Sequence, residues 1–364
     1  MINVNELYKI LKKNNCDFYS GVPDSVLKEF SNSLNKNKNH IIATNEGSAV
    51  SIGIGNYLST KKIPCIYMQN SGLSNAINPI ISIAHKKVYS IPLILIIGWR
   101  GSPNIKDEPQ HEAKGKITQN ILKLLNIDYT ILKNKSDLNR FDKKIKLAKK
   151  NKSIVACLIE KGILKKSTSQ KLHKDTYLFD KTFFLKELML NLPKKTKVIT
   201  STGYNSREIM YIKNKFKSIK SKNFYMVGGM GHSMSVALGY SLSSKNKTIC
   251  IDGDGSLLMH LGGIKTLADF AKNNLKYILL NNNAHDSVGG QITYSKNINF
   301  QKFSKSLGFK KFYLIKDKLN MKKKIKEFIS DKDLSFMEVK VSGSKIKNLP
   351  RPDNLIKIKN QFMK

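Results

Sequence analysis

In the segment 250–259, CIDGDGSLLM, an apolar strand runs directly into two aspartates separated by single glycines. Residues 247–251 have the composition of a short strand, and residues 257–270 carry an apolar helical rhythm. A strand-to-helix turn made of Gly and Asp suits a phosphate group or a metal ion. The turn alone is a weak signal, so a second set of ligands is needed elsewhere in the chain.

Three asparagines at 281–283 supply that second set. They end the apparent strand LKYILLNNNAHD, and Asn282 stands 28 residues after Asp254. The carboxyl ends of parallel strands open on one edge of a sheet, where ligands bind, so Asp254 and the asparagines are expected to converge. A carboxylate, an amide oxygen, a backbone carbonyl and phosphate oxygens are hard ligands suited to Mg²⁺. The spacing therefore predicts a diphosphate held through Mg²⁺.

The net charge of +38 raises a different class of function, that of a basic nucleic-acid-binding protein. The basic residues are spread along all 364 positions, however, and only four of the 64 are arginines: Arg100, Arg140, Arg207 and Arg351. Solvated lysines are the ordinary interpretation of such a pattern. The few arginines become candidates for bidentate contacts with an oxyanion, which a lysine cannot reproduce.

Length and patterning predict an α/β protein of two domains. The hydrophobic content of 40% fits a globular protein with real cores. Apolar runs alternate with amphipathic stretches within 1–165 and again within 181–364, which is typical of βαβ units and parallel sheets. A polar stretch without periodicity, 166–180, is interpreted as a linker. The part that begins at Ser342 is expected to be an irregular tail.

The location is expected to be cytoplasmic. No apolar run approaches the ~20 residues that span a bilayer, and the first residues are too polar for a signal peptide. Four scattered cysteines show no spacing of metal ligands, and we expect them to be reduced core thiols.

With these motifs the chain resembles the thiamine diphosphate enzymes, whose cofactor motif is GDG followed at a matching distance by NN. The resemblance extends over nearly the whole chain through GVPDSVLKEF, MQNSGLSNAINPI, IIGWRGSP, DEPQH, GGMGHSMSVALGY and NNNAHDSVGGQ. These stretches are similar to the phosphonopyruvate decarboxylases, with the sulfopyruvate decarboxylases as close relatives. The resemblance implies two thiamine diphosphate-binding-fold domains, a pyrimidine-binding one at 1–165 and a diphosphate- and Mg²⁺-binding one at 181–364. Gly229, where Ser is commoner, and Asn283, in place of Gly or Glu, are small departures.

The resemblance also implies a set of cofactor and metal residues. The Mg²⁺ ligands would be Asp254, Asn282 and the carbonyl of Ala284. Residues that face the cofactor would be Thr202, Gly203, Gly255 and Ser256 at the diphosphate, Gly228 at the exocyclic amine, and Met230, the bulky residue that bends the cofactor.

Glu46, in ATNEGSAVSIGIG, matches the glutamate that contacts the aminopyrimidine ring in this class. It would hold a proton against that ring, in a setting desolvated by apolar neighbours such as Ala49 and Val50. On position alone, Glu46 is an ordinary carboxylate at the start of a helix.

On the substrate side, Asp24 in GVPDS and His111 in DEPQH match acid–base positions of the class, and protonation after CO₂ leaves needs such a donor. Without the resemblance, Asp24 is interpreted as a helix cap and His111 as a surface residue. Arg100, Arg351 and His285 are candidates for binding the substrate, since a phosphonate dianion favours forked, charged donors.

The implied activity is decarboxylation of 3-phosphonopyruvate to 2-phosphonoacetaldehyde and CO₂ in phosphonate biosynthesis, with thiamine diphosphate and Mg²⁺. Sulfopyruvate or another 2-oxo acid is an alternative substrate, because no motif indicates the terminal group directly. A nucleic-acid-binding protein and an inactive scaffold of the same fold are alternatives from other classes. The expected partner is a second copy of the chain, in a dimer or larger assembly with shared active sites. Neither nucleic acid nor a membrane is expected as a partner.

Overall fold

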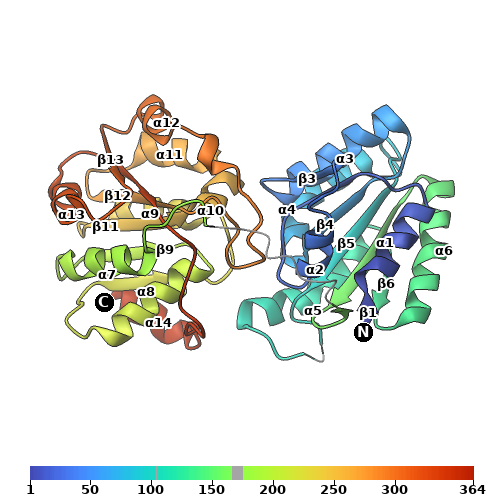
Figure 1. The fold of residues 1–364 in the computed structure, drawn as a ribbon, viewed down its shortest axis with the longest axis horizontal. Coiled ribbons are helices and arrows are strands. Elements are labelled where there is room, and N and C mark those ends of the chain that lie inside the picture. Colours follow the sequence, from blue (N-terminus) through green and yellow to red (C-terminus); the bar gives the residue numbers. More distant parts are fainter. Residues whose placement is uncertain (104, 166–174) are drawn as a thin grey trace. The chain divides into compact units, whose positions relative to one another are not determined.

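A computed structural model describes residues 1–103, 105–165 and 175–364 of the chain. The chain divides into two compact units, Met1–Leu172 and His173–Lys364 (Figure 1). Of the predicted linker at 166–180, the part 166–174 lies outside the described residues.

The first unit is built on a parallel sheet of six strands in the order β3-β2-β4-β5-β7-β6. The strands are β2 (Tyr19–Gly21), β3 (His40–Ile42), β4 (Cys65–Gln69), β5 (Leu93–Trp99), β6 (Asp128–Leu132) and β7 (Ile154–Glu160). The helices are α1 (Val4–Lys13), α2 (Lys28–Ser33), α3 (Glu46–Thr60), α4 (Leu73–Pro79), α5 (Pro109–Leu124) and α6 (Lys135–Asn151), with short turns η1 (Asn70–Gly72) and η2 (Ile80–Ala84). A separate pair, β1 (Ile2–Asn3) and β8 (Leu164–Lys165), joins the ends of this unit.

The strands of this sheet are apolar throughout because helices cover both faces. Successive side chains alternate between two buried clusters, so that Tyr67 packs with α1, α2 and α6, while Ile66 packs with α3, α4 and α5. Each fully buried side chain of this size contributes roughly 1.5–3 kcal/mol. These two layers hold the sheet edge that carries the candidate residues.

The second unit repeats the design with six parallel strands in the order β10-β9-β11-β12-β14-β13. The strands are β9 (Lys197–Thr200), β10 (Lys222–Tyr225), β11 (Thr248–Gly253), β12 (Leu275–Asn281), β13 (Lys311–Ile315) and β14 (Ser335–Lys340). The helices are α7 (Lys181–Asn191), α8 (Tyr204–Lys215), α9 (Ser233–Ser243), α10 (Asp254–Met259), α11 (Gly262–Phe270), α12 (Phe300–Leu307), α13 (Met321–Ser330) and α14 (Leu355–Met363), with the turn η3 (Ser295–Asn297). Helices α7, α8 and α13 pack on one face, and α9, α11 and α14 pack on the other.

Both sheets have the same strand order when the six strands are counted along each unit: second, first, third, fourth, sixth, fifth. In each, the connection changes direction between the first and third strands, and ligands of α/β sheets bind at such a switch point. The switch lies between β2 and β4 in the first unit and between β9 and β11 in the second. The predicted α/β class, with parallel sheets flanked by helices, is confirmed.

Two local predictions differ from the structure. The single helical rhythm at 257–270 is two helices, α10 and α11, because the chain leaves helical geometry at His260, with φ −133° and ψ 55°. The expected irregular tail ends in a helix, α14, whose Phe362 is buried against the second sheet's core. None of the helices in the described ranges is both long and apolar enough to cross a membrane.

Candidate active site

Asp254 stands at the switch point of the second unit, where β11 ends and α10 begins. Its side chain is only 2% exposed. One carboxylate oxygen, Oδ2, accepts hydrogen bonds from the hydroxyls of Thr293 and Ser295, the latter at 2.8 Å. Burial raises the pKa of Asp254, and these hydroxyl donors act in the opposite direction. A carboxylate kept in such a place favours a positive ligand over water.

The asparagines that follow β12 lie beside Asp254, as the spacing predicts. Ser295 shows this directly, because its hydroxyl contacts Asp254, Asn281 (2.8 Å) and Asn283 (3.4 Å). Asn281 is buried and donates to Glu338 at 2.9 Å. Asn283 has φ +57°, a left-handed conformation that Asn tolerates better than most residues. Strands β11 and β12 pair in register up to this edge.

Asn282 is the asparagine whose side chain is left half-buried at the edge of the sheet. Its Oδ1 accepts a bond of 3.3 Å from the amide of Ala284, which is itself buried. Asp252, by contrast, is fully buried below the edge and accepts from the Tyr277 hydroxyl at 3.0 Å. Asp252 therefore has a structural place, and Asp254 and Asn282 are the members of the two motifs that reach the edge.

Thr293 and Ser295 are the residues that sequence reasoning missed. They follow the loop after β12, and their hydroxyls hold Asp254 from 39 and 41 residues away. An ion pair also contacts the loop after β12. Asp286 in that loop lies 3.6 Å from Lys181, and Lys181 pairs with Glu208 at 3.1 Å. The only trace in the sequence is the i, i+2 spacing of two hydroxyls after NNNAHDSVGGQ.

The predicted diphosphate-facing residues gather around the same edge. Thr202 accepts from the amide of Gly228 at 3.0 Å, which joins the end of β9 to the glycine-rich loop after β10. Ser256 accepts from the amide of Gly231 at 3.0 Å, which joins that loop to α10. The loop needs glycine, because Gly228, Gly229 and Gly231 all have positive φ.

Five other predicted residues lie in this unit. Gly203 has φ +86° and precedes α8. Met230 is half-buried in the glycine-rich loop. Gly255 lies so near the His285 ring that an added Cβ would come within 2.9 Å of it. Burial lowers the pKa of His285 to about 4, so its imidazole is neutral at physiological pH. Arg351 is exposed and lies outside any helix or strand.

A metal ion at this edge would depend on oxygen ligands of mixed type. Across the described ranges, no group of three or more His, Cys, Asp and Glu side chains could hold one. The residues present are a buried carboxylate with Oδ2 fixed by hydroxyls, a half-buried amide and a nearby carbonyl. One negative charge with neutral oxygens fits Mg²⁺ that also binds a diphosphate. The donor set is therefore compatible with the predicted ligands Asp254, Asn282 and Ala284.

In the first unit, Glu46 is the first residue of α3, which Asn45 caps by accepting from the amide of Ser48 at 2.8 Å. Glu46 is 5% exposed and accepts from Asn75 at 2.8 Å. Its carboxyl group packs on Gly72, where an added Cβ would come within 2.4 Å of an Oε atom. The glutamate is thus held away from water by named neighbours.

Asp24 lies at the switch point of the first unit, just beyond β2. It is 1% exposed and accepts from the amides of Val26 (3.0 Å) and Leu27 (3.1 Å), and from Gln69 at the end of β4 (2.5 Å). Burial raises its pKa, and these donors act against that rise. The helix-cap interpretation of Asp24 is wrong, because the N-cap of α2 is Leu27 and no side chain caps that helix. The two amide bonds lie in the turn before α2, and the bond from Gln69 reaches across the switch point.

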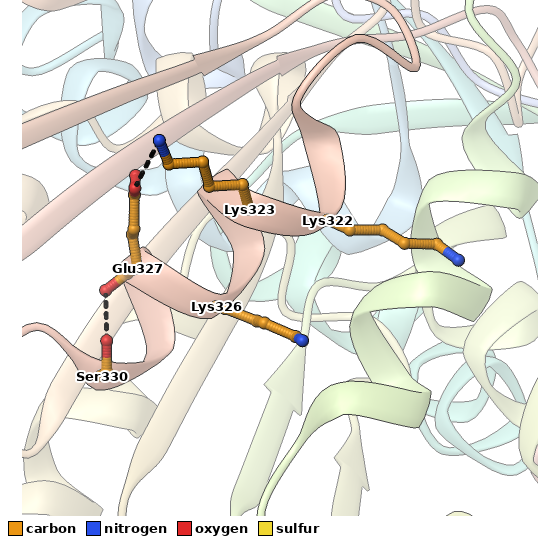
Figure 2. A pocket seen from close by; sticks show the side chains of 5 residues that line it. All are labelled: Lys322, Lys323, Lys326, Glu327 and Ser330. Atoms are coloured by element: carbon orange, nitrogen blue, oxygen red, sulfur yellow. Dashed lines mark hydrogen bonds and ion pairs between the residues drawn. The ribbon is translucent and has the colours of Figure 1, made fainter.

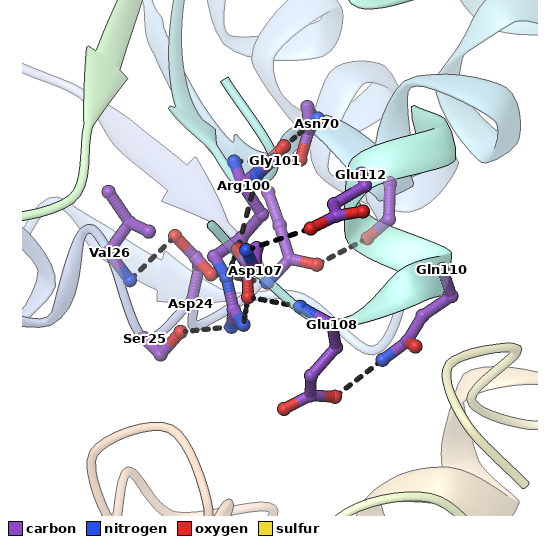
Figure 3. A network of polar contacts seen from close by, with 12 residues as sticks. Asp24, Ser25, Val26, Asn70, Arg100, Gly101, Asp107, Glu108, Gln110 and Glu112 are labelled. Carbon is purple, nitrogen blue, oxygen red and sulfur yellow. Dashed lines mark hydrogen bonds and ion pairs between the residues drawn. The ribbon is translucent and has the colours of Figure 1, made fainter. Parts of the chain in front are cut away.

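Arg100, at the end of β5, forms a bidentate pair with Asp107, with Nε at 2.6 Å and Nη2 at 2.5 Å (Figure 3). Its Nη1 donates to Ser25 at 3.1 Å. The predicted oxyanion partner of Arg100 is thus, in this structure, a carboxylate of the same unit. His111 follows in the first turn of α5. Burial, and then the charge of Arg100, lowers the pKa of His111 to about 4.

A hollow on α13 is unrelated to these residues. It is lined by Lys322, Lys323, Lys326, Glu327 and Ser330 (Figure 2). Lys323 pairs with Glu327 at 4.0 Å, four residues along the helix, and Lys322 reaches Glu187 at 3.5 Å. This is a solvated charged face, which agrees with the ordinary interpretation of the many lysines.

Two protein families match the chain. The family described as "Thiamine pyrophosphate enzyme, N-terminal TPP binding domain" matches residues 4–122, and "Thiamine pyrophosphate enzyme, C-terminal TPP binding domain" matches residues 202–339. The fold and these matches define the class, a thiamine diphosphate enzyme.

Proteins of similar sequence show which family within this class the chain belongs to. Phosphonopyruvate decarboxylase of Streptomyces hygroscopicus is 31% identical over 80% of this chain and 75% of its own length. The protein of the same name from Streptomyces viridochromogenes is 30% identical over 80% and 76%. Sulfopyruvate decarboxylase of Methanosarcina acetivorans is 26% identical over 95% and 93%. The chain belongs to the phosphonopyruvate decarboxylase family of thiamine diphosphate-dependent carboxy-lyases.

Proposed function

We propose that this enzyme decarboxylates 3-phosphonopyruvate to 2-phosphonoacetaldehyde and CO₂, with Mg²⁺-bound thiamine diphosphate, in phosphonate biosynthesis. The observation that carries the proposal is the cluster of Asp254 with the segment 281–284 at a switch point, where the Ser295 hydroxyl contacts Asp254, Asn281 and Asn283. That cluster occurs in a chain about 30% identical to two phosphonopyruvate decarboxylases. It supports both the cofactor and the metal, because a diphosphate needs a cation between it and a carboxylate.

The cofactor supplies the electron sink that decarboxylation of a 2-oxo acid requires. In this proposal Asp254, Asn282 and the carbonyl of Ala284 bind Mg²⁺. Four residues of the second unit, Thr202, Gly203, Gly255 and Ser256, bind the diphosphate. Gly228 would accept from the exocyclic amine, and Met230 would be the bulky residue that bends the cofactor. Glu46, whose buried carboxyl group lies next to Gly72 and Asn75, would contact the pyrimidine ring.

Asp24 and His111 are proposed to handle the proton that replaces CO₂. A buried carboxyl group with a raised pKa can keep a proton at higher pH than an exposed one, and a neutral imidazole can donate or accept. Arg351 and His285 stay candidates for the phosphonate end. Arg100 is a weaker candidate, since its fork already binds Asp107.

Sulfopyruvate is the second candidate substrate, because the relative from Methanosarcina acetivorans aligns over 95% of this chain. We also propose that two copies of the chain share each active site, and that the enzyme works in the cytoplasm. The four cysteines are free and buried, which agrees with a reducing compartment.

The test is an assay of the purified protein with Mg²⁺ and thiamine diphosphate, in which the rate of aldehyde formation is measured. Phosphonopyruvate, sulfopyruvate and pyruvate are each used as the substrate. The proposal expects the highest kcat/KM with phosphonopyruvate. A higher kcat/KM with sulfopyruvate would move the enzyme to the second candidate, and no aldehyde from any 2-oxo acid would reject decarboxylation.

A further inference from the structure

The pair Arg100–Asp107 occupies an unusual place for an ion pair. The side chains of Arg100 and Asp107 are only 13% and 9% exposed. Nε and Nη2 of Arg100 each donate to one carboxylate oxygen of Asp107. Asp107 also accepts from the amides of Gly101 (3.1 Å) and Glu108 (2.9 Å). An arginine held so completely by one carboxylate is shaped for fixing two chain segments together.

The segments that this pair joins both carry proposed acid–base residues. On one side, Arg100 donates to Ser25, the residue after Asp24 (Figure 3). On the other side, Asp107 lies four residues before His111, in the segment that begins α5. The charge of Arg100 acts on the pKa of both Asp24 and His111. The charge of Arg100 therefore reaches both proposed acid–base residues, Asp24 and His111.

The end of β5 and the helix α5 are packed as closely as backbones allow. An added Cβ at Gly101 would lie 1.9 Å from the carbonyl oxygen of His111, and one at Gly115 would lie 1.6 Å from that of Gly101. Trp99 donates to the carbonyl of Gly115 at 3.0 Å. Asn70 donates to the Arg100 carbonyl and to Thr118, both at 2.9 Å. Gly115 and Thr118 fix the body of α5, and its first turn is held both by the packing of Gly101 on the His111 carbonyl and by Asp107.

We propose that Arg100 and Asp107 form a clasp that positions His111 relative to Asp24, with both members acting as positioning residues that do not bind the substrate. The clasp joins the turn after β2 to the start of α5. Nδ1 of His111 is buried and has no hydrogen-bond partner among the described residues. Because no hydrogen bond of Nδ1 holds the ring, the position of the ring depends on the backbone of α5. This inference rests on the proposed function for its catalytic meaning, whereas its structural part does not.

The first test uses neither substrate nor cofactor. The ring of His111 is titrated by NMR in the wild type, Arg100→Lys and Asp107→Asn, with its signal assigned by its loss in His111→Gln. The charges that act on this ring are those of Arg100, Asp107 and Lys114. Burial is the largest cause of its low pKa, so opening the clasp should raise the titration midpoint from about 4 toward the ordinary 6.5 in both variants.

A purely electrostatic role predicts a different pattern. Asp107 raises the pKa of His111 through its charge, so Asp107→Asn would lower the midpoint, and Arg100→Lys, which keeps the charge, would leave it unchanged. That pattern would overturn the clasp. Arg140→Lys, in the remote pair with Asp137, is the matched control and should leave the midpoint at the wild-type value. Circular dichroism on each variant confirms that the titrated protein is folded.

The second test uses the complete enzyme. Arg100→Lys and Asp107→Asn should each lower kcat about 100-fold, the effect of a displaced catalytic group. The double variant should be no worse than the poorer single one, because both open the same clasp. The ratio of KM for phosphonopyruvate to KM for pyruvate should stay constant. A selective rise in KM for phosphonopyruvate in Arg100→Lys, with Asp107→Asn active, would instead make Arg100 a substrate ligand and reject the proposal. If the wild type decarboxylates none of these acids, the proposed function fails, and the titration still decides the clasp.

Discussion

Replacing Asp254 by Asn should stabilise the protein in the absence of cofactor while it removes the response to cofactor. Asp254 is 2% exposed, and burial raises its pKa, so the ionised carboxylate is unfavourable where it lies. An amide oxygen can accept from Thr293 and Ser295 in the same way, without a buried charge. Single stabilising substitutions commonly gain about 0.5–2 kcal/mol. For a unit of this size, about 1 kcal/mol corresponds to about 2–4 °C in Tm.

The stability that Asp254→Asn gains over the wild type should increase with pH. Because the pKa of Asp254 is raised in the folded state, the folded protein keeps this proton to a higher pH than the unfolded chain does. The free energy of unfolding therefore falls as the pH rises above the ordinary value of 3.8. Asp254→Asn removes that loss, so its advantage over the wild type should be absent in acid and grow toward neutral pH.

The assay is thermal unfolding of both proteins with and without Mg²⁺ and thiamine diphosphate. A ligand at 100 times its Kd stabilises the wild type by about 2.7 kcal/mol, or about 5–11 °C at this size. Asp254→Asn should show none of this shift. Asp252→Asn is the matched control, since Asp252 is also buried with a hydroxyl donor but lies below the edge, and it should keep the shift. A full cofactor shift in Asp254→Asn would refute the assignment of Asp254 as a metal ligand.

Three further predictions follow from the same residues. Thr293→Val removes one donor to Asp254 and should weaken Mg²⁺ binding about 10- to 150-fold, the loss of one hydrogen bond to a charged group, measured by titration with Mg²⁺ at fixed thiamine diphosphate. Glu46→Gln and Asp254→Ala should each be inactive, and random mixing of the two should restore about a quarter of all sites if each site is shared by two chains; no recovery in confirmed mixed dimers would exclude sharing. Arg351→Lys should raise KM for phosphonopyruvate more than that for pyruvate, and equal effects would remove Arg351 from the pocket.

The strands could be read from the sequence because buried parallel strands are continuous apolar runs. β5, for instance, is LILIIGW, with every residue buried. The three-residue strand β2 (YSG) has no such run, so an apolar pattern does not indicate it. The convergence of Asp254 and 281–283 could likewise be predicted, since one rule of parallel sheets places consecutive strand ends on one edge. Thr293 and Ser295 could not, because hydroxyls in a loop have neither periodicity nor charge.

Arg100 shows a different limit. Its rarity in a lysine-rich chain correctly indicated a planar, bidentate contact, but the sequence did not identify which anion it meets. Asp107 lies only seven residues away, across a turn whose course depends on the packing of Gly101 against α5. That packing is a property of two backbones, and side-chain patterns carry no record of it. The structure shows that Arg100 pairs with Asp107, and the positioning role that we propose for Arg100 is built on that pair.

Both units place a buried carboxyl group at the switch point of the same topology. Asp24 follows the first strand of its sheet and Asp254 follows the third strand of its own, on the two sides of the switch. Each is nearly inaccessible to water and has a raised pKa, and Asp24 is so close to β5 that Gly98 could not carry a Cβ. Burying such a group lowers the free energy of unfolding, because its charged form is removed from water. Buried carboxyl groups of this kind are therefore common at functional sites. Because the surrounding donors differ, amides and Gln69 at Asp24 but hydroxyls at Asp254, the two sites are suited to different tasks: holding a proton in the first unit and holding a cation in the second.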